Sequence, residues 1–212
     1  MMDAGPRRGL YLLTPDEADT DRLLARVERA LVPGVALLQY RNKAAGAALR
    51  RTQLRSLLPL ARERGVPLLA NDDWRLAADL GADGAHLGAA DGDLAEARAA
   101  LGPRAILGAT CHASLDRAQR ARDAGASYLA FGAVFPSATK PGAASLALPV
   151  LGEARSLGLP VVAIGGLRPD NAGAALAAGA DLLAVLGAVF EAADPAAQVR
   201  AFLSLFTHPD SA

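Results

Sequence analysis

Residues that could bind an anion are gathered in one short segment of this 212-residue sequence. Gln39, Arg41 and Lys43 alternate along the motif QYRNK, so in an extended chain their side chains leave the same face. Hydrogen-bond donors brought together at the end of a buried strand cost desolvation free energy unless an anion or a carboxylate meets them. The spacing therefore predicts an anion site; the alternative is a structural cluster of ion pairs.

Two carboxylates, Asp72 and Asp91, end what we expect to be consecutive strands and should therefore be neighbours in space. Oxygen ligands without a partnering His or Cys cluster suit Mg²⁺, which keeps several waters and takes phosphate oxygens as further ligands. The alternative is that Arg41 or Lys43 pairs with them in a closed salt-bridge network. We expect Asp73 to be a helix N-cap and not a metal ligand.

Groups suited to phosphate lie in the second half of the sequence. Ser137, Thr139 and Lys140 supply two hydroxyls and an ammonium in one loop, a combination that suits an oligophosphate. Gly165-Gly166 and Gly187 follow the last two predicted strands, where backbone N–H groups and a helix N-terminus can hold a phosphate. Taken one at a time, these glycines could equally be ordinary tight-turn residues.

For the remaining candidate residues we favour structural roles. His86 lies in a segment that otherwise looks like core, so we expect a buried histidine with satisfied hydrogen bonds. Cys111 and His112 follow Thr110 near a strand end, but no base and orienting group can be identified for a cysteine nucleophile. Trp74 is expected to pack in a helix.

The elements that must position these residues alternate regularly. Short apolar runs without strict alternation predict buried parallel strands, and we place them at Gly9–Leu13, Ala36–Tyr40, Pro67–Ala70, Gly84–Leu87, Ala105–Gly108, Tyr128–Gly132, Val161–Ile164 and Leu182–Leu186. Longer Ala-, Leu- and Arg-rich stretches between them predict helices, at Asp19–Leu31, Ala47–Arg64, Asp73–Leu80, Asp93–Leu101, Ser114–Ala124, Leu148–Leu157, Pro169–Ala178 and Pro195–Phe206.

The alternation predicts an α/β fold consisting of one (β/α)₈ TIM barrel. A turn recurs as Leu80-Gly-Ala-Asp, Ala124-Gly-Ala-Ser and Ala178-Gly-Ala-Asp, each before a strand, which indicates repeated units of a single domain spanning 1–212. We expect segments 1–8 and 207–212 to be flexible termini. The rival, a doubly wound open sheet, is disfavoured because no G-x-G-x-x-G follows the first strand.

Bulk composition narrows the partners. The formal net charge is +0, so nothing predicts long-range attraction to nucleic acid or to an anionic membrane, and any anion binding must be local. The single cysteine and the short N-terminal apolar stretch favour a cytoplasmic protein. Whether the chain forms a homo-oligomer is left open by the sequence.

Six motifs in order resemble the thiamine phosphate synthase family: QYRNK, NDD, GAHLG-x-x-D, FGAVFPSATKPG, VAIGGL and LLAVLGAVF. The similarity runs from about Gly9 to Phe190. It implies a transferase that joins an aminopyrimidine pyrophosphate to a thiazole phosphate and releases pyrophosphate. It implies a Mg²⁺ cofactor held by Asp72 and Asp91.

The resemblance also assigns roles to the other candidates. Catalytic charge would come from Arg41, Lys43 and Lys140. The pyrimidine pyrophosphate would contact the same three residues together with Gln39, Asn71 and Thr110. The thiazole phosphate would contact the hydroxyl loop and the last two strand ends, at Ser137, Thr139, Gly165, Gly166, Val185, Leu186 and Gly187.

The sequence departs from the family pattern at several positions. Ala89 stands where the family usually has Gln, Ser137 where it has Thr, and Gly187 where it has Ser; Thr110 supplies the hydroxyl of an altered segment. One rival is the related thiazole tautomerase, which is expected to carry a His where this chain has Ala133. The others are a non-catalytic precursor-binding barrel and a phosphosugar isomerase, the latter disfavoured because no paired acid and base appears.

Overall fold

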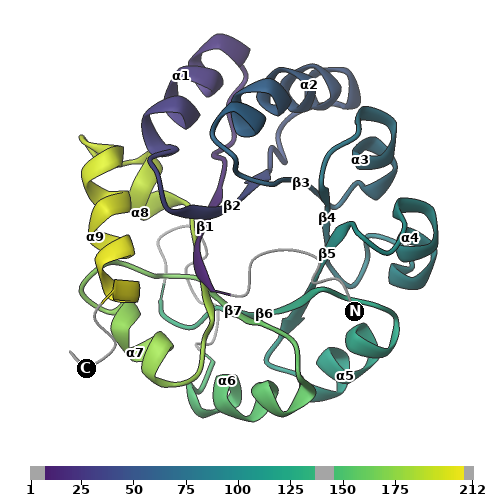
Figure 1. Ribbon diagram of the computed structural model, residues 1–212, viewed down its shortest axis with the longest axis vertical. Coiled ribbons are helices and arrows are strands. Elements are labelled where there is room, and N and C mark those ends of the chain that lie inside the picture. Colours follow the sequence, from purple (N-terminus) through teal and green to yellow (C-terminus); the bar gives the residue numbers. More distant parts are fainter. Residues whose placement is uncertain (1–7, 137–145, 208–212) are drawn as a thin grey trace.

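A computed structural model describes residues 8–136 and 146–207 and shows a closed barrel of eight parallel strands (Figure 1). The strands are β1 Gly9–Leu13, β2 Val35–Tyr40, β3 Leu68–Asn71, β4 Gly84–Leu87, β5 Ile106–His112, β6 Tyr128–Gly132, β7 Val161–Ile164 and β8 Leu182–Val185. Each strand pairs with the next in the chain, and β8 pairs with β1. The predicted TIM barrel is confirmed, and the open sheet is excluded.

Helices surround this barrel on its outside (Figure 1). They are α1 Thr20–Ala30, α2 Ala47–Glu63, α3 Trp74–Leu80, α4 Leu94–Leu101, α5 Leu115–Asp123, α6 Pro149–Ala154, the 3₁₀ turn η1 Arg155–Leu157, α7 Ala172–Ala177, α8 Gly187–Phe190 and α9 Pro195–Thr207. The sequence prediction missed α8, a single turn too short to carry a helical repeat. It also started α7 too early, because residues 169–171 form a turn.

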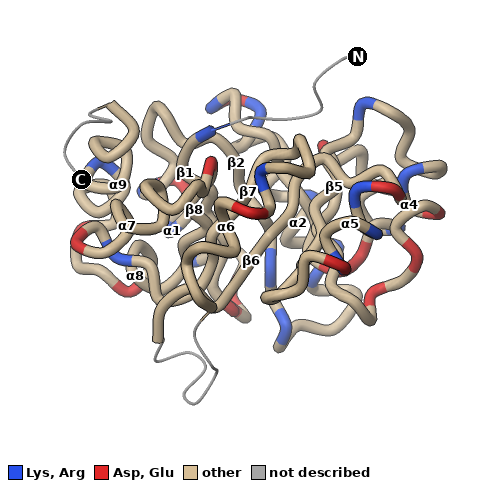
Figure 2. The backbone as a smooth tube through the Cα atoms, turned by 90° about the horizontal axis from the view of Figure 1, so that it is seen from below, with Lys and Arg blue, Asp and Glu red and all other residues tan. Residues whose placement is uncertain are grey.

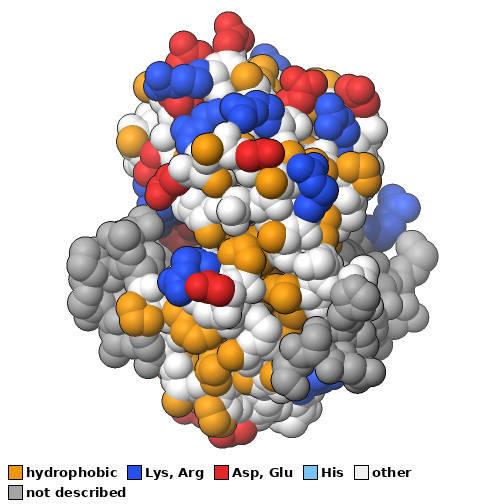
Figure 3. Space-filling view, turned by 90° about the vertical axis from the view of Figure 1, so that its left-hand side faces the viewer, with side chains coloured by type: hydrophobic (Ala, Val, Ile, Leu, Met, Phe, Trp, Pro, Cys, Tyr) orange, Lys and Arg blue, Asp and Glu red, His pale blue; other side chains and the backbone are white. Residues whose placement is uncertain are grey.

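The core has two layers because alternate strand residues face opposite sides. One cluster fills the barrel interior, including Tyr11, Leu37, Leu69 and Tyr128; the other lies between the strands and the helices. Most Lys, Arg, Asp and Glu positions lie on the outer helices and connecting loops (Figure 2). On the side of the molecule toward α8 and α9, charged side chains gather in one half of the view and hydrophobic ones are scattered over the other (Figure 3).

The repeated Gly-Ala-Asp or Gly-Ala-Ser turn closes a helix and starts a strand. Asp83, Ser127 and Asp181 each accept a hydrogen bond from a backbone N–H of the preceding strand, at 2.8, 3.0 and 2.9 Å. The glycine two residues before each of these side chains has a positive φ, a conformation that commonly ends a helix. The repeat therefore marks the amino-terminal rim of the barrel and leaves the opposite rim for chemistry.

Within the described ranges, no helix is both long enough and apolar enough to cross a membrane. The predicted N-cap is confirmed at Asp73, whose side chain accepts from Leu76 N, and Ser114 caps α5 in the same way by accepting from Arg117 N. Asp194 likewise accepts from Ala197 N at the start of α9.

Candidate active site

The inward-facing rows of side chains change from apolar to polar at the carboxyl ends of four strands. In β2, Leu37 is followed two residues later by Gln39; in β3, Leu69 is followed by Asn71. His86 in β4 and Thr110 in β5 complete the ring of polar residues. Because β5 extends to His112, Thr110 lies within a strand and not after it as predicted.

A chain of hydrogen bonds crosses the barrel and joins three of these polar residues, Gln39, His86 and Thr110. Gln39 Nε2 donates to the Tyr11 hydroxyl at 2.7 Å, and that hydroxyl lies 2.8 Å from the Tyr128 hydroxyl. Tyr128 Oη lies 2.8 Å from His86 Nδ1, and His86 Nε2 lies 2.8 Å from Thr110 Oγ1. Both ring nitrogens of His86 have partners, so the predicted satisfied histidine is confirmed.

Burial keeps His86 neutral. It lowers the pKa of the ring to about 4, and the nearby charge of Asp91 opposes this effect in part. Burial likewise raises the pKa of the Tyr11 and Tyr128 hydroxyls well above their usual value. The hydrogen-bond chain therefore consists of neutral donors and acceptors at neutral pH.

The segment after β2 is held by the loop after β1. Thr14 Oγ1 accepts from Arg41 N and donates to Arg41 O, both at 2.8 Å. Asp16 Oδ1 accepts from Arg41 Nη1 at 3.1 Å and from Lys43 N at 2.8 Å. Gln39 is 2 % exposed and faces the interior, whereas Arg41 and Lys43 reach the rim, so the three side chains extend to different depths.

The intervening residues of QYRNK face α2. Tyr40 Oη donates to Gln53 Oε1 at 2.8 Å, and Asn42 Nδ2 donates to the same oxygen at 3.0 Å. Asn42 Nδ2 and Gln53 Nε2 also donate to Glu17 O, at 2.6 and 2.8 Å. The alternation therefore serves two purposes, because one set of side chains enters the site and the other anchors the segment.

Asp72 and Asp91 are brought together as predicted. They are close enough to affect each other's charge: burial first and the neighbouring Asp72 carboxyl second raise the pKa of Asp91. Lys43 Nζ lies 3.4 Å from Asp72 Oδ2, and Asp91 Oδ2 accepts from Gly88 N at 2.8 Å. Asp72 has φ 65°, an uncommon conformation for a residue other than glycine, and its N–H donates to His86 O at 2.8 Å.

This carboxylate pair fits a divalent cation. Two like charges facing each other are costly unless a cation lies beside them, and the Lys43 side chain is 58 % exposed and provides only part of that charge. No cluster of three or more His, Cys, Asp or Glu suited to a metal occurs among the described residues. Two carboxylate groups as donors suit an ion that takes its other ligands from water and phosphate, as Mg²⁺ does.

The loops after β6 and β7 are joined by their backbones. Val134 N donates to Ile164 O at 3.0 Å, and Phe135 N donates to Gly165 O at 3.1 Å. Gly166 has φ 65°, and a Cβ there would lie 2.4 Å from Pro136 O. Ser137, Thr139 and Lys140 lie outside the described residues, but the segment leading to them is fixed against the glycines.

The third predicted phosphate-binding segment follows β8. Val185 ends this strand, Leu186 precedes α8, and Gly187 begins that helix. The first N–H groups of a helix have no partner within it, so they can bind an anion. A Cβ on Gly187 would meet only the end of the Glu191 side chain, at 3.2 Å, so the backbone there does not depend on glycine.

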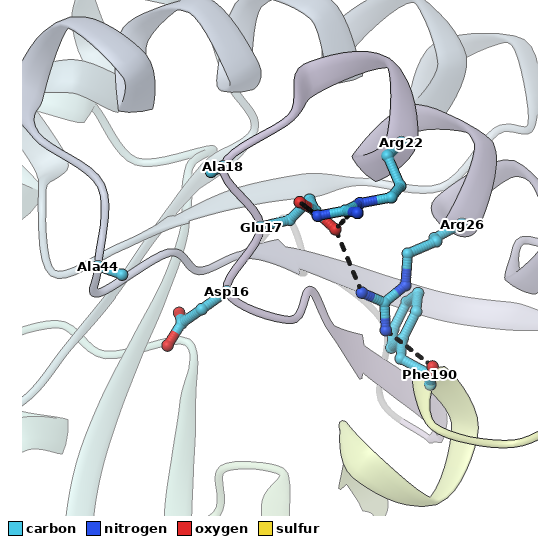
Figure 4. Close-up of a pocket in the computed structure, with 7 residues that line it drawn as sticks. All are labelled: Asp16, Glu17, Ala18, Arg22, Arg26, Ala44 and Phe190. Carbon is cyan, nitrogen blue, oxygen red and sulfur yellow. Dashed lines mark hydrogen bonds and ion pairs between the residues drawn. The ribbon is translucent and has the colours of Figure 1, made fainter.

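An ion-pair cluster ties α8 to α1 beside the barrel mouth (Figure 4). Glu17 is 6 % exposed and lies between Arg22 and Arg26 in an open pocket of about 670 Å³. Arg22 Nε donates to Glu17 Oε2 at 2.6 Å, and Arg26 Nη2 donates to Phe190 O at 2.8 Å. Glu17 thereby holds the cation that anchors the carboxyl end of α8.

Replacing Glu17 with Gln should lower the free energy of unfolding at neutral pH, with a smaller effect in acid. Hydrogen bonds from Arg22 and then from Asp19 N lower the pKa of Glu17 from 4.5 to about 2. A lowered carboxyl pKa stabilises the fold above the unfolded value, and that contribution is lost as the pH falls through about 2. Denaturant unfolding of both proteins at neutral pH and at about pH 3 measures this. Glu63→Gln, at an exposed position, is the control. If Glu17→Gln lowered the free energy of unfolding by the same amount at both pH values, the prediction would be contradicted.

Cys111 is unsuited to nucleophilic chemistry, as expected. Its side chain is fully buried, and burial raises the pKa of the thiol to about 11. His112 has φ 53° and an exposed side chain. Ala89, where the family usually has Gln, is exposed in the loop between β4 and α4.

Sequence reasoning missed the contribution of the first strand. Thr14 and Asp16 were not recognised as supports for Arg41 and Lys43, although the run Thr-Pro-Asp at a strand end is the kind of signal used elsewhere in the chain. Tyr11 and Tyr128 carried no signal, because an aromatic residue in an apolar run predicts core packing.

The fold and this rim define a class of protein. It is a (β/α)₈ barrel whose carboxyl-terminal rim carries two cations, an amide and a hydroxyl on one side and glycines after β7 and β8 on the other. A family model described as thiamine monophosphate synthase matches residues 10–189. Curated relatives named thiamine-phosphate synthase include one from Aromatoleum aromaticum (strain DSM 19018 / LMG 30748 / EbN1), 56% identical over 94% of this chain and 96% of its own. Another, from Methylobacillus flagellatus (strain ATCC 51484 / DSM 6875 / VKM B-1610 / KT), is 51% identical over 95% and 96%.

A solved structure of thiamine phosphate pyrophosphorylase from Pyrococcus furiosus is similar over 97% of this chain and 98% of its own, with a TM-score of 0.83 and 30% identity. The chain belongs to the thiamine monophosphate synthase family. It is therefore an enzyme of the transferase class, and the family resemblance found in the sequence is confirmed.

Proposed function

We propose that this protein forms thiamine phosphate from 4-amino-5-hydroxymethyl-2-methylpyrimidine pyrophosphate and 4-methyl-5-(2-hydroxyethyl)thiazole phosphate, releasing pyrophosphate. The observation that carries the proposal is the carboxylate pair Asp72 and Asp91, with Lys43 3.4 Å from Asp72, at the barrel mouth. Such a pair suits a metal-bound pyrophosphate. Membership of the family over residues 10–189 supports the reaction class.

The pyrimidine pyrophosphate would lie over strands β2 to β5. Its phosphates would meet Arg41, Lys43 and Lys140, and its ring would face Gln39, Asn71 and Thr110. Asp72 and Asp91 would hold Mg²⁺, which, when bound, would place positive charge beside the leaving pyrophosphate.

The thiazole phosphate would lie across the barrel mouth. The glycines Gly165 and Gly166, the start of α8 at Gly187 and the hydroxyls of Ser137 and Thr139 would receive its phosphate. The hydrogen bonds from Val134 N and Phe135 N to the β7 end support this arrangement, because they bring two of these elements together.

The reaction is dissociative in this proposal. The bond between the exocyclic methylene carbon and the pyrophosphate oxygen breaks, and its electron pair leaves with the oxygen. The electron-rich aminopyrimidine supports the positive charge until the lone pair of the thiazole nitrogen forms the new carbon–nitrogen bond. Neither reacting atom loses a proton, so the site needs charge and positioning rather than a nucleophile or a strong base.

The direct test is incubation of the purified protein with both substrates and Mg²⁺, with and without EDTA. We expect thiamine phosphate and pyrophosphate in equal amounts, and no product with EDTA. Calorimetry with each substrate alone should show binding of both. Binding without product would favour a precursor-binding protein, and full activity in EDTA would contradict the metal assignment.

Lys43→Ala should lower kcat more than it raises KM for the thiazole phosphate, because Lys43 lies on the pyrophosphate side of the site. The loss should be about 100-fold if its charge acts mainly on the leaving group. Arg51→Ala removes a cation that pairs with Asp79 on the outer surface, at 2.7 Å, and is the matched control. A change confined to the thiazole KM would contradict the placement of Lys43.

A further inference from the structure

The donor in the hydrogen-bond chain through the barrel is fixed at its Gln39 end. Gln39 Nε2 donates to Tyr11 Oη, and the described partners of that hydroxyl are this amide and the Tyr128 hydroxyl. The Tyr11 proton must therefore go to Tyr128, because a buried hydroxyl proton without an acceptor is costly. The Tyr128 proton then goes to His86 Nδ1, its other partner at 2.8 Å.

The consequence reaches the substrate side of the site. A neutral imidazole carries one ring proton, so an Nδ1 that accepts leaves the proton on Nε2. His86 Nε2 then donates to Thr110 Oγ1, 2.8 Å away, and the hydroxyl proton of Thr110 is directed elsewhere. At the other end, Gln39 uses its amide nitrogen on Tyr11, so its carbonyl oxygen is the end available to a ligand.

We propose that Tyr11, Tyr128 and His86 are positioning residues that make Thr110 a hydrogen-bond donor and Gln39 an acceptor toward the aminopyrimidine. This inference rests on the proposed function, and it adds a specificity device to it. An aminopyrimidine offers an amine that donates and ring nitrogens that accept, which complements an acceptor and a donor held in fixed orientation. An oxo analogue, with a carbonyl in place of the amine, would place two acceptors against each other at Gln39.

Packing of the aromatic rings keeps the hydrogen-bond chain rigid. Tyr11 and Tyr128 meet edge to face with ring centroids 5.8 Å apart, and His86 stacks on Tyr128 at 5.6 Å. A Cβ on Gly108 would lie 2.0 Å from Tyr128 Cζ, so the glycine makes room for this ring. The five residues of the chain come from five strands, so barrel closure holds every link.

The tautomer of His86 can be observed without turnover. Long-range ¹H–¹⁵N correlation NMR on the full chain distinguishes Nδ1 from Nε2 protonation, and His86→Asn identifies its signals among the three histidines. We expect Nε2 to carry the proton. A proton on Nδ1 would reverse the chain and overturn the proposal.

Binding of the aminopyrimidine pyrophosphate alone tests the link to Thr110. Tyr128→Phe should weaken it about tenfold, and Tyr11→Phe is a second variant should the first fail to fold. If Tyr128 acts through Thr110, the Tyr128→Phe, Thr110→Val double variant should bind no more weakly than Thr110→Val. Tyr40→Phe removes another buried tyrosine hydroxyl, one bonded to Gln53 at 2.8 Å, and its effect should multiply with that of Thr110→Val.

Multiplying effects for Tyr128→Phe and Thr110→Val would overturn the positioning role. Equal loss of affinity for the amino and oxo analogues in Tyr128→Phe would also overturn it. Failure of the proposed function looks different: the wild type would form no thiamine phosphate, while the tautomer and the binding effects of Tyr128→Phe would remain.

Discussion

Asp91→Asn is expected to stop Mg²⁺-dependent formation of thiamine phosphate almost completely. Asp91 shares the site with Asp72, and its carboxylate has a pKa raised by burial and by that neighbour. A metal ion contributes several kcal/mol of charge stabilisation, so we expect kcat to fall by at least about 100-fold. Steady-state kinetics over a range of Mg²⁺ concentrations measures this, and unchanged activity at saturating substrate would remove Asp91 from the metal site.

The same variant should melt at a higher temperature than the wild type in EDTA. The amide removes one of two facing negative charges and can still accept from Gly88 N, as Asp91 does at 2.8 Å. Mg²⁺ with pyrophosphate should raise the Tm of the wild type and leave that of Asp91→Asn unchanged. Asp79→Asn, which breaks an exposed ion pair with Arg51, is the control and should keep both the activity and the Mg²⁺-induced shift.

Gly166→Ala should disrupt the thiazole-phosphate side of the site. The new Cβ would lie 2.4 Å from Pro136 O and 2.5 Å from Phe135 O, both backbone atoms, in a residue with φ 65°. The segment leading into the loop after β6 must then move, and an alanine in this conformation costs about 1–2 kcal/mol by itself. We expect KM for the thiazole phosphate to rise about tenfold or more, since 1.4 kcal/mol corresponds to a factor of ten. The affinity for the pyrimidine pyrophosphate should change much less.

A second glycine provides the matched control. Gly173 lies in α7, and a Cβ there would meet nothing within 4 Å. Gly173→Ala should therefore leave both KM values unchanged and stabilise the protein by about 0.5–1 kcal/mol. If Gly166→Ala showed the same behaviour, the close packing of the β6 and β7 loops would not shape the phosphate site.

Much of the fold was predictable because its signals are local. Apolar runs buried on both faces located all eight strands to within a few residues, and the turn before Asp83, Ser127 and Asp181 marked the strand starts. The charged candidates were predictable for a related reason. Arg41, Lys43, Asp72 and Asp91 stand out as charged residues in the short segments that follow apolar runs, and parallel strands bring such segments to the same rim.

Other features depended on the tertiary structure. Neighbouring strands and helices set the extension of β5 through His112 and the single turn α8. The local sequence of these two elements does not predict them. Asp16 supports Arg41 and Lys43 from another loop, and this pairing depends on how the two loops lie in the folded barrel. Glu17 is linked to α8 through Arg26, which pairs with Glu17 and donates to Phe190 O.

The gathering of these charged side chains at one rim was therefore determined by the sequence, since residue type and strand position suffice to place them there. The donor direction within the barrel was decided by the tertiary structure alone. Tyr11 and Tyr128 are 117 residues apart, and their hydroxyls meet only because the sheet closes and its register aligns them. Hydrophobic periodicity gives a tyrosine its inward orientation, but only the closed barrel determines which hydroxyl, ring nitrogen or amide it meets.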